Sequence, residues 1–318
     1  KVTPPGRKPC DVGAAVFNVE TVYNAYRALQ AGEPVLEKYV TLAGAFARPV
    51  TLRVPVGTPF SALAKAAGGA AEGVVLLNGG PLSGRLAAPS DVVTKTTNAI
   101  LALPETHPIV RRQRMRTPVQ YLRARAACCQ CGMCTALCPR RLIGYPIKPH
   151  AFMRAAGHGL TDVPDAYVQA LYCSRCGLCE AFACGQGLSP RALLSSTALT
   201  LLESGVAAPE VPSPKPLPER VMRGISLDRL MGRLDLKRYA RPAPYQPGGF
   251  KVSALFLPLV MHAGPPSIPV VSAGQAVSRG EMIAESEGLG APIHAPLDGR
   301  VAQVTGAGIW LEGGDGLG

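Results

Sequence analysis

Short apolar segments broken by glycine and proline dominate the first hundred residues of the chain. Residues 61–67 predict a helix that ends at Gly68, and residues 78–81 predict a turn. Three apolar runs around this helix predict strands, at residues 50–55, 73–77 and 99–103. This β–α–β–β order is typical of a small grasp-like sheet that crosses a helix.

The N-terminal residues predict one further strand and one further helix. Residues 14–17 predict the strand, and Asn18 opens a helix that ends at Gly32. The strand has no earlier partner, because it begins only a few residues after Lys1. We therefore expect that a portion of the protein normally precedes this sequence.

After the predicted sheet, the pattern of hydrophobic and polar residues divides the chain into further segments. Residues 105–205 predict helices around two cysteine-rich loops. Residues 207–219 contain five prolines and predict an extended linker, and residues 220–241 are basic and predict a short helix. Residues 250–312 again predict short strands joined by glycine turns.

The fold class expected from this organisation is multidomain α+β. A chain of 318 residues is long enough for several small domains, and a hydrophobic content of 47% excludes wholesale disorder. The sequence contains no stretch of eighteen apolar residues, so it predicts no membrane-spanning helix. The first residues lack the apolar core of a secretory signal. The expected divisions are residues 1–48, 49–104, 105–206, 207–249 and 250–318.

Eight of the ten cysteines fall into two tight groups with nearly the same spacing. The first group reads Cys-x2-Cys-x2-Cys-x3-Cys-Pro, and the second reads Cys-x2-Cys-x2-Cys-x4-Cys-Gly. A disulfide framework would spread its cysteines over the chain instead. Three cysteines at x2 spacing followed by a Cys-Pro pair form the ferredoxin run that holds [4Fe-4S] clusters. Gly132 and Gly177 allow each loop to wrap closely around a cluster.

In two-cluster ferredoxins the fourth cysteine of each run binds the other cluster. The sequence therefore predicts cluster I on Cys128, Cys131, Cys134 and Cys184. It predicts cluster II on Cys138, Cys173, Cys176 and Cys179. The longer last gap of the second run leaves the identity of one ligand, Cys184, open.

Zinc is the alternative metal, although zinc usually takes pairs of cysteines rather than repeated triplets. Cys129 is interpreted as a bystander within its loop, and Cys10 as a small buried hydrophobic residue. His150, His262 and His294 could each contact a bound cofactor. A lone histidine in a proline-flanked turn is more often a hydrogen-bonded structural residue.

Positive charge is concentrated around the first cysteine run. The net charge of the chain is +12, and residues 105–154 contain ten basic residues and one acidic residue. Cations near a negatively charged cluster tune its potential, and an exposed basic surface can also attract an acidic redox partner. A simple solvated basic helix remains an alternative. The absence of interleaved aromatic residues or a nucleic-acid module argues against nucleic-acid binding.

Three short motifs resemble the flavoprotein subunit of respiratory complex I and the C subunit of the Rnf complex. They are Asp11-Val12-Gly13, Asn18-Val19-Glu20-Thr21 and Gly57-Thr58-Pro59. The resemblance implies that residues 1–48 end an FMN- and NADH-binding domain and that residues 49–104 form a soluble-ligand-binding (SLBB-like) β-grasp domain.

The same resemblance implies that Asn18, Glu20 and Thr21 belong to an FMN site. It also implies that the NADH loop and most of the FMN contacts would precede residue 1. The N-terminus of the helix could favour the FMN phosphate. Asn18 serving only as the helix cap is the alternative.

The motif Gly144-Tyr145-Pro146-Ile147-Lys148-Pro149-His150, between the clusters, is similar to the family of cobalamin reductases of propanediol-utilising bacterial microcompartments. Residues 274–280 and 291–299 resemble a barrel-sandwich hybrid of the biotinyl or lipoyl type. Leu297 and Asp298 stand where a carrier domain needs a lysine, which predicts a structural or docking role. The C-terminal place of this module favours the microcompartment reductase.

The resemblance implies electron transfer from NADH and FMN through two [4Fe-4S] clusters to cob(II)alamin, and hence an NADH-dependent cob(II)alamin reductase. A corrinoid, a corrinoid adenosyltransferase and microcompartment shell proteins are the implied partners. The implied location is cytoplasmic, inside or attached to a bacterial microcompartment. Two alternatives stay open: an Rnf-like subunit that passes electrons to protein partners, and a scaffold protein with structural metal clusters.

Overall fold

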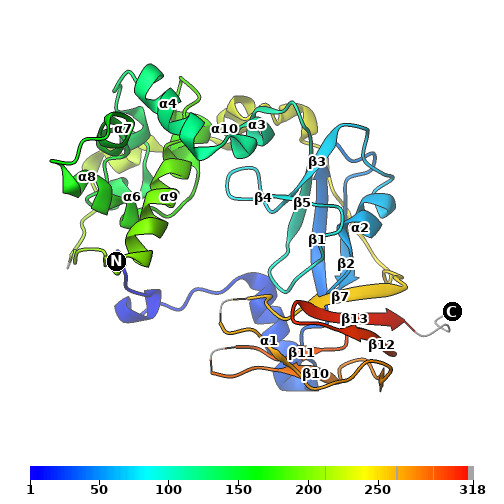
Figure 1. The fold of residues 1–318 in the computed structure, drawn as a ribbon. Helices are drawn as coiled ribbons and strands as arrows, with labels where there is room; N and C mark the ends of the chain where they lie inside the picture. The colour runs from blue at the N-terminus through cyan, green and yellow to red at the C-terminus, as the bar shows by residue number, and fades with distance from the viewer. Residues whose placement is uncertain (212, 263, 289, 314–318) are drawn as a thin grey trace. The chain divides into compact units, whose positions relative to one another are not determined.

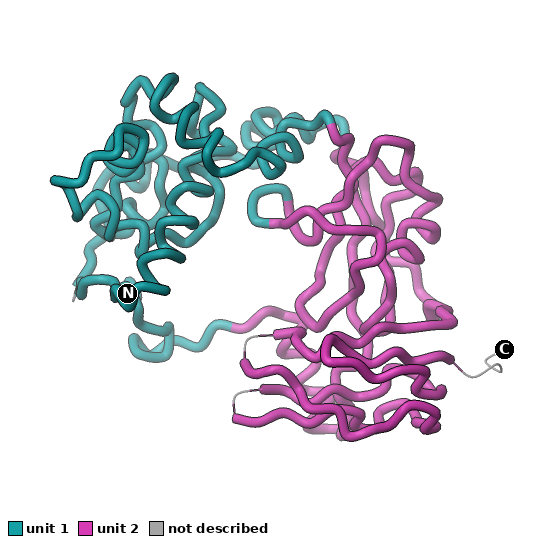
Figure 2. The backbone as a smooth tube through the Cα atoms, in the orientation of Figure 1, with its two compact units in different colours: residues 1–16, 81–83, 106–238 teal, residues 17–80, 84–105, 239–318 magenta. Residues whose placement is uncertain are grey.

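The computed structural model describes residues 1–211, 213–262, 264–288 and 290–313 (Figure 1). Parts of the expected linker and C-terminal module, at residues 212, 263, 289 and 314–318, lie outside this description. The chain divides into two compact units (Figure 2). Unit 1 comprises residues 1–16, 81–83 and 106–238, and unit 2 comprises residues 17–80, 84–105 and 239–318.

Within its described residues, unit 2 contains a six-stranded sheet in the order β4-β3-β5-β1-β2-β6. The central strand β1 is antiparallel to β2 and parallel to β5. The edge strand β6 follows the cysteine-rich region in sequence and pairs in parallel with β2. The strands span Glu37–Gly44 (β1), Val50–Pro55 (β2), Val74–Asn78 (β3), Arg85–Ala87 (β4), Ala99–Pro104 (β5) and Tyr245–Gln246 (β6).

Alternating burial explains why β1 is the centre of the sheet. Its residues alternate between half-buried and buried, and Val40 and Leu42 are completely buried. Helix α2 (Phe60–Ala66) covers the same core with the buried side chains of Phe60 and Leu63. The expected strands at 50–55, 73–77 and 99–103 and the expected helix at 61–67 are thus present to within about a residue.

The N-terminal region differs from the expectation in two respects. Residues 14–17 are not a strand, because they are exposed and pair with no other described segment. Instead, η1 (Pro9–Val12) precedes a stretch of coil, and α1 (Val19–Ala31) follows it. Strand β1 lies within residues 1–48, which were assigned to a different domain, yet its pairings place it in the sheet.

The C-terminal part of unit 2 is a pair of small sheets. One has the described order β11-β10-β8, and the other has the described order β7-β13-β12-β9. Their inward side chains, such as Leu257, Ile283 and Ile309, form one completely buried core. The strands span Ala254–Pro258 (β7), Ile268–Pro269 (β8), Ala276–Val277 (β9), Met282–Glu285 (β10), Ile293–His294 (β11), Gly299–Val304 (β12) and Gly308–Gly313 (β13).

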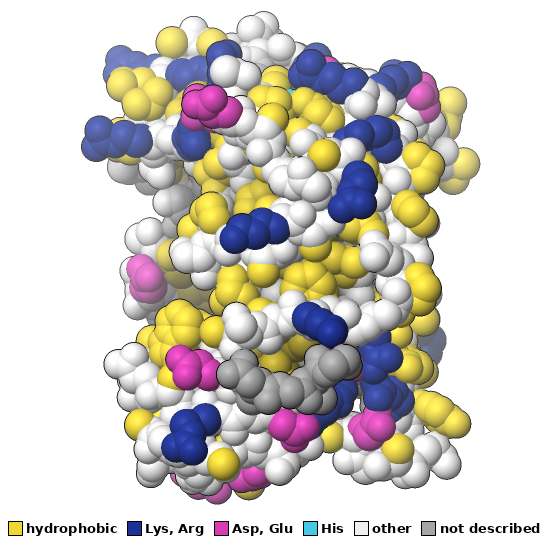
Figure 3. Space-filling view, turned by 90° about the vertical axis from the view of Figure 1, so that its right-hand side faces the viewer, with side chains coloured by type: hydrophobic (Ala, Val, Ile, Leu, Met, Phe, Trp, Pro, Cys, Tyr) yellow, Lys and Arg dark blue, Asp and Glu magenta, His cyan; other side chains and the backbone are white. Residues whose placement is uncertain are grey.

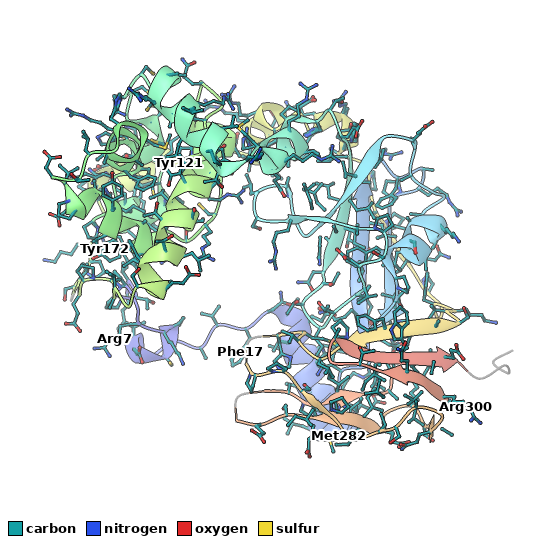
Figure 4. All side chains as sticks on the ribbon, in the orientation of Figure 1. Arg7, Phe17, Tyr121, Tyr172, Met282 and Arg300 are labelled. Atoms are coloured by element: carbon teal, nitrogen blue, oxygen red, sulfur yellow. The ribbon has the colours of Figure 1, made fainter. Side chains whose placement is uncertain are left out.

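Unit 1 is built from short helices around the cysteines, as the sequence predicts. Phe152 on α7 and Leu193 on α9 are completely buried in its core. Figure 4 labels Tyr121 on α4, which is half-buried, and Tyr172 in η2, which is buried. The elements span Pro108–Arg114 (α3), Thr117–Ala127 (α4), Met133–Ala136 (α5), Pro139–Leu142 (α6), Pro149–His158 (α7), Pro164–Val168 (α8), Gln169–Tyr172 (η2), Cys179–Ala183 (η3) and Pro190–Glu203 (α9).

The proline-rich segment after α9 makes specific contacts within unit 1. The Tyr172 hydroxyl donates to the carbonyl of Pro209 at 2.9 Å, and the Leu217 amide donates to the carbonyl of Leu142 at 3.0 Å. Three short elements follow, at Pro218–Arg223 (η4), Leu227–Arg233 (α10) and Lys237–Tyr239 (η5). Of the helices in the described ranges, none has the length and apolarity needed to cross a membrane.

Candidate metal centres

The four cysteines assigned to cluster I line one pocket of unit 1. Cys128 follows the last residue of α4, Cys131 lies in the loop, and Cys134 lies in α5. Cys184 comes from the second run and directly follows η3. All four belong to the wall of the same pocket, together with the half-buried His150. The fold thus brings Cys184 to the first three cysteines across about fifty residues of chain.

The four cysteines assigned to cluster II line a second pocket of unit 1. Cys138 stands just before α6, Cys173 just after η2, and Cys179 begins η3. Cys176 completes the set in the same pocket wall. Cys138 and Cys179 are buried, whereas Cys131 in the first pocket is exposed. The second site is therefore the more enclosed of the two.

The pKa of Cys134 shows how closely the first four thiols gather. Burial raises the pKa of Cys134 to about 12, and the nearby thiols of Cys184, Cys128 and Cys131 contribute to the rise. These are the other three members of the same predicted set. Because a thiol bound to a metal is deprotonated, metal loading of this pocket releases protons.

The second set has the same electrostatic signature. Burial raises the pKa of Cys179 well above its usual value, with further contributions from Glu180, Cys173, Cys138 and Cys176. Burial also raises the pKa of Cys138 and of Cys173. In each pocket, burial thus favours the neutral form of the most buried thiols, Cys134 in the first and Cys138, Cys173 and Cys179 in the second.

Several N–H groups already point at the cysteine sulfurs. Gln130 Nε2 lies 3.1 Å from Cys128 Sγ, and the Leu188 amide lies 3.4 Å from Cys184 Sγ. In the second loop the Arg175 amide lies 3.4 Å from Cys173 Sγ. Hydrogen bonds to cluster sulfurs are among the features that set the potential of an iron–sulfur cluster.

The π-helical turn η3 explains the longer last gap of the second run. A π-helix bonds residue i to residue i+5, so that it accommodates one residue more than an α-helical turn. Here η3 spans Cys179–Ala183 and ends just before Cys184. The additional residue is thus absorbed within the turn, and Cys184 still reaches the first pocket.

The donor set fits two [4Fe-4S] clusters. Each pocket presents four thiols and amide donors, which is the ligand chemistry of a cubane cluster. Among the described residues, no three His, Cys, Asp or Glu side chains converge to hold a single metal ion. Cys129 and Cys10 are exposed. The expectation that Cys10 is a buried hydrophobic residue is therefore wrong, because the N-terminal segment places it at the surface.

Two charged residues beside the second pocket were missed by the sequence analysis. Glu180 is 2% exposed and forms an ion pair with Arg191 at 2.8 Å. Arg191 itself belongs to the pocket wall. The available signal was an acidic residue directly between Cys179 and the apolar run Ala181-Phe182-Ala183.

The three histidines considered as ligands have different surroundings. His150 Nδ1 lies 2.7 Å from Thr135 Oγ1 in the wall of the first pocket. His262 and His294 lie in unit 2, where His262 Nε2 accepts a hydrogen bond from the Ala291 amide at 2.8 Å. Burial lowers the pKa of His262 and of His294, and Lys95 lowers it further. The structure thus gives His150 and His262 hydrogen-bonded structural roles.

The three residues considered for FMN lie at the start of α1 in unit 2. Asn18 Oδ1 accepts a hydrogen bond from the Glu20 amide at 2.9 Å, so that Asn18 caps the helix. The Glu20 carboxylate is paired with Lys38 and accepts from the Tyr39 amide at 3.2 Å. Thr21 is exposed. The acceptors of Asn18 and Glu20 are therefore already used within the chain.

Leu297 and Asp298, which stand where a carrier domain needs a lysine, take part in the packing of the C-terminal module. Asp298 Oδ1 accepts a hydrogen bond from the Arg279 amide at 2.7 Å, and Leu297 packs against the core between the two small sheets. Arg279 in turn pairs with Glu37 at 3.0 Å. These contacts fix Leu297 and Asp298 within unit 2.

The basic residues before the first cysteine run are distributed over α3 and α4. Arg111, Arg114, Arg116 and Arg125 are exposed, and Arg112 is half-buried. On the face drawn in Figure 3, lysine and arginine side chains stand among hydrophobic and acidic ones. Part of the expected positive surface is therefore accessible to a partner.

Two protein-family models match this chain, one in the cysteine-rich part of unit 1 and one in the C-terminal part of unit 2. Residues 127–189 match the 4Fe-4S dicluster domain, and residues 247–311 match the RnfC barrel sandwich hybrid domain. The first match spans both cysteine runs. The second spans the two small sheets of unit 2, so that the expectation of a barrel-sandwich hybrid is confirmed.

Among curated relatives, cobalamin reductase PduS of Citrobacter freundii is 36% identical over 308 residues, which cover 95% of this chain and 68% of the relative. The protein of the same name from Salmonella typhimurium is 35% identical over 307 residues, covering 95% of this chain and 67% of the relative. The C subunit of the ion-translocating oxidoreductase complex of Citrobacter koseri is 33% identical over 170 residues, covering 51% of this chain and 22% of the relative.

Proposed function

Because this chain belongs to the family of cobalamin reductase PduS, we propose that it is an oxidoreductase that reduces cob(II)alamin to cob(I)alamin. Its dicluster domain makes it an iron–sulfur electron-transfer protein. Beyond iron–sulfur electron transfer, we propose a specific electron acceptor and a specific electron donor. It assigns cluster I to Cys128, Cys131, Cys134 and Cys184, and cluster II to Cys138, Cys173, Cys176 and Cys179.

The observation that carries the proposal is the meeting of both cysteine sets at η3. Cys179 of the second set begins this turn, and Cys184 of the first set directly follows it. When bound, each [4Fe-4S] cluster accepts and donates one electron at a time. One ligand of each set thus lies at the same turn, which supports electron passage between neighbouring centres.

We propose NADH as the electron donor, with FMN as the carrier that receives its hydride. The balance is one NADH and two cob(II)alamin giving NAD⁺, one proton and two cob(I)alamin. Asn18, Glu20 and Thr21 are the residues of this chain assigned to FMN. The side chains of Asn18 and Glu20 already bond within the chain. The proposed FMN contact is therefore the N-terminus of α1, where these residues lie.

The remaining assignments follow from the family alone. A corrinoid adenosyltransferase is the proposed recipient of the product, and microcompartment shell proteins are proposed partners at the site of action. The six-stranded sheet with α2 is proposed to be an SLBB-like β-grasp domain. The order of strands β1, β2 and β5, with α2 packed against their core through Phe60 and Leu63, supports that assignment.

Metal analysis and one-electron chemistry test the proposal together. Anaerobically prepared protein should contain about eight irons and eight sulfides per chain and show EPR signals of two interacting clusters after reduction. Reduced protein, freed of reductant, should convert about two cob(II)alamin per chain to cob(I)alamin. Stoichiometric zinc without a reducible signal would contradict the cluster assignment. Loaded clusters that leave cob(II)alamin unchanged would contradict the acceptor.

An Rnf-like role is the second candidate function. The similarity to a component of an ion-translocating oxidoreductase over half of the chain favours it, together with the exposed arginines of α3 and α4. In that role the reduced protein should pass electrons to an acidic redox protein faster than to a corrinoid. The rates should fall steeply with ionic strength, because complementary charge controls such encounters.

A further inference from the structure

A buried ion pair stands directly beside the second cysteine pocket. Glu180 follows Cys179 and is 2% exposed. Its Oε1 lies 2.8 Å from Arg191 Nη2, and its Oε2 accepts a hydrogen bond from the Ala192 amide at 3.2 Å. Both carboxylate oxygens are therefore engaged, and the carboxylate fixes one edge of the Arg191 guanidinium.

A second contact fixes the other edge of the same guanidinium. Arg191 Nη1 donates to the carbonyl of Leu82 at 2.7 Å, within unit 1. Arg191 is the second residue of α9, and the next turn of this helix buries Leu193 and Leu194. Helix, carboxylate and carbonyl together hold Arg191 in one position. A planar guanidinium with two separate partners keeps that orientation better than a flexible ammonium does.

The position of Arg191 is meaningful because of the pocket that it faces. Arg191 lines the same pocket as Cys138, Cys173, Cys176 and Cys179. The described lining of the first pocket contains cysteines, His150 and apolar or amide side chains, with neither lysine nor arginine. The fixed cation therefore distinguishes the wall of the second site from that of the first.

A cation beside an iron–sulfur cluster changes its potential in a known direction. Reduction adds one negative charge to a cluster that is already negative, and a nearby positive charge stabilises that added charge. The effect is larger inside a protein than in water, since the local dielectric constant is lower. An adjacent carboxylate opposes the cation, so the net effect depends on which partner stands closer to the cluster.

We propose that Arg191 is a potential-setting residue that raises the midpoint potential of cluster II, and that Glu180 positions its guanidinium against the pocket. The inference rests on the proposed function, because it requires that Cys138, Cys173, Cys176 and Cys179 hold a cluster. Arg191 then makes reduction of the enclosed cluster easier than burial alone allows. Arg191 lines the second pocket and not the first, so its charge should shift the potential of cluster I less than that of cluster II.

Potentiometric titration followed by EPR tests the inference on the full chain with both clusters loaded. Arg191→Gln should move both midpoints unequally, with the larger shift to lower potential at cluster II. Arg191→Lys should restore most of the shift, because it keeps the charge and loses only the forked geometry. Arg223→Gln is the matched control, since Arg223 is an exposed arginine of η4 that lines neither cysteine pocket; it should leave both midpoints unchanged.

Removing Arg191 alone leaves Glu180 buried without its partner, which can destabilise the fold. Glu180→Gln and the double variant Glu180→Gln/Arg191→Gln avoid an unpaired buried carboxylate. The double variant should have a lower midpoint than Glu180→Gln, and their difference isolates the charge of Arg191.

Equal midpoints in those two variants would overturn the inference while the clusters remain loaded. A wild-type chain without iron would overturn the proposed function, and the inference with it, so the two failures are distinguishable by iron content.

Discussion

Gln130 and Arg175 adopt the same left-handed backbone conformation, with φ of 54° and 58°, at equivalent positions in the two cysteine loops. Each stands two residues after the first cysteine of its run. Two residues further on, Gly132 and Gly177 are also left-handed, with φ of 74° and 80°. The two loops therefore share one backbone path, which turns three cysteines of each run towards a common point.

The two glycines give a matched pair of substitutions. A side chain at Gly132 would meet nothing within 4 Å, whereas a Cβ at Gly177 would lie 2.6 Å from the Leu82 carbonyl oxygen. Gly132→Ala should therefore cost only the left-handed strain, about 1–2 kcal/mol. Gly177→Ala should cost about 1–3 kcal/mol more, because backbone must shift.

Unfolding of the helices in guanidinium, followed by far-UV circular dichroism, measures both costs. Iron content should also distinguish the variants. Gly177→Ala should lose iron from cluster II, and Gly132→Ala should retain both clusters. Equal destabilisation by the two substitutions would show that Leu82 does not restrict the second loop.

A second pair of substitutions tests the crossed ligand assignment. Cys184→Ser removes a thiol from the first pocket, and Cys129→Ser removes an exposed thiol next to Cys128. Cys184→Ser should reduce the iron content from about eight to about four per chain and abolish the interaction between the EPR signals. Cys129→Ser should leave both unchanged. Loss of iron in Cys129→Ser, with full loading of Cys184→Ser, would mean that Cys129 is the cluster I ligand and Cys184 is not.

The sequence predicts the cysteine sets and most of the sheet because these depend on local pattern. Cysteine spacing and short apolar runs are visible within at most twelve residues of chain. Strand β1 was missed although its residues alternate in burial, because residues 1–48 were assigned to another domain. The strand expected at 14–17 is absent, because an apolar run becomes a strand only where a partner strand lies beside it.

The Glu180–Arg191 pair and the return of β6 to the sheet lie beyond the reach of sequence pattern. Arg191 is separated from Leu82 by 109 residues, and β6 pairs with β2 across nearly two hundred residues. Such contacts depend on how helices pack in three dimensions. The same holds for η3, since nothing in its composition separates a π-turn from an α-turn.

Arg241 provides a test of one such long-range contact in unit 2. Its guanidinium donates to the carbonyls of Gly44 at 2.9 Å, Phe46, and Ala47 at 3.4 Å, at the turn between β1 and β2. Arg241→Gln should destabilise unit 2 by about 1–2 kcal/mol, because these carbonyls lose charged donors. Urea denaturation followed by fluorescence of the single tryptophan, Trp310, measures the loss. The control is Lys65→Gln on the exposed side of α2, and an equal change in both variants would contradict the prediction.

Acid should destabilise unit 2 through His262 and His294. Burial, and then the charge of Lys95, lowers the pKa of both histidines in the folded state. Below the usual histidine pKa of about 6.5, the unfolded chain therefore binds more protons than the folded chain. The free energy of unfolding should be highest above this pH and fall as the pH decreases through about 6.5 towards 5.

Lys95→Gln should make this pH dependence shallower, because it removes the repulsion and leaves the burial in place. The Lys95 ammonium donates to the Pro292 carbonyl at 2.6 Å, and burial lowers its own pKa. Glutamine can retain a hydrogen bond to that carbonyl without the charge. Urea midpoints from Trp310 fluorescence at a series of pH values measure the slope, with Lys65→Gln as the control. An unchanged slope in Lys95→Gln would mean that burial alone holds the two histidines neutral.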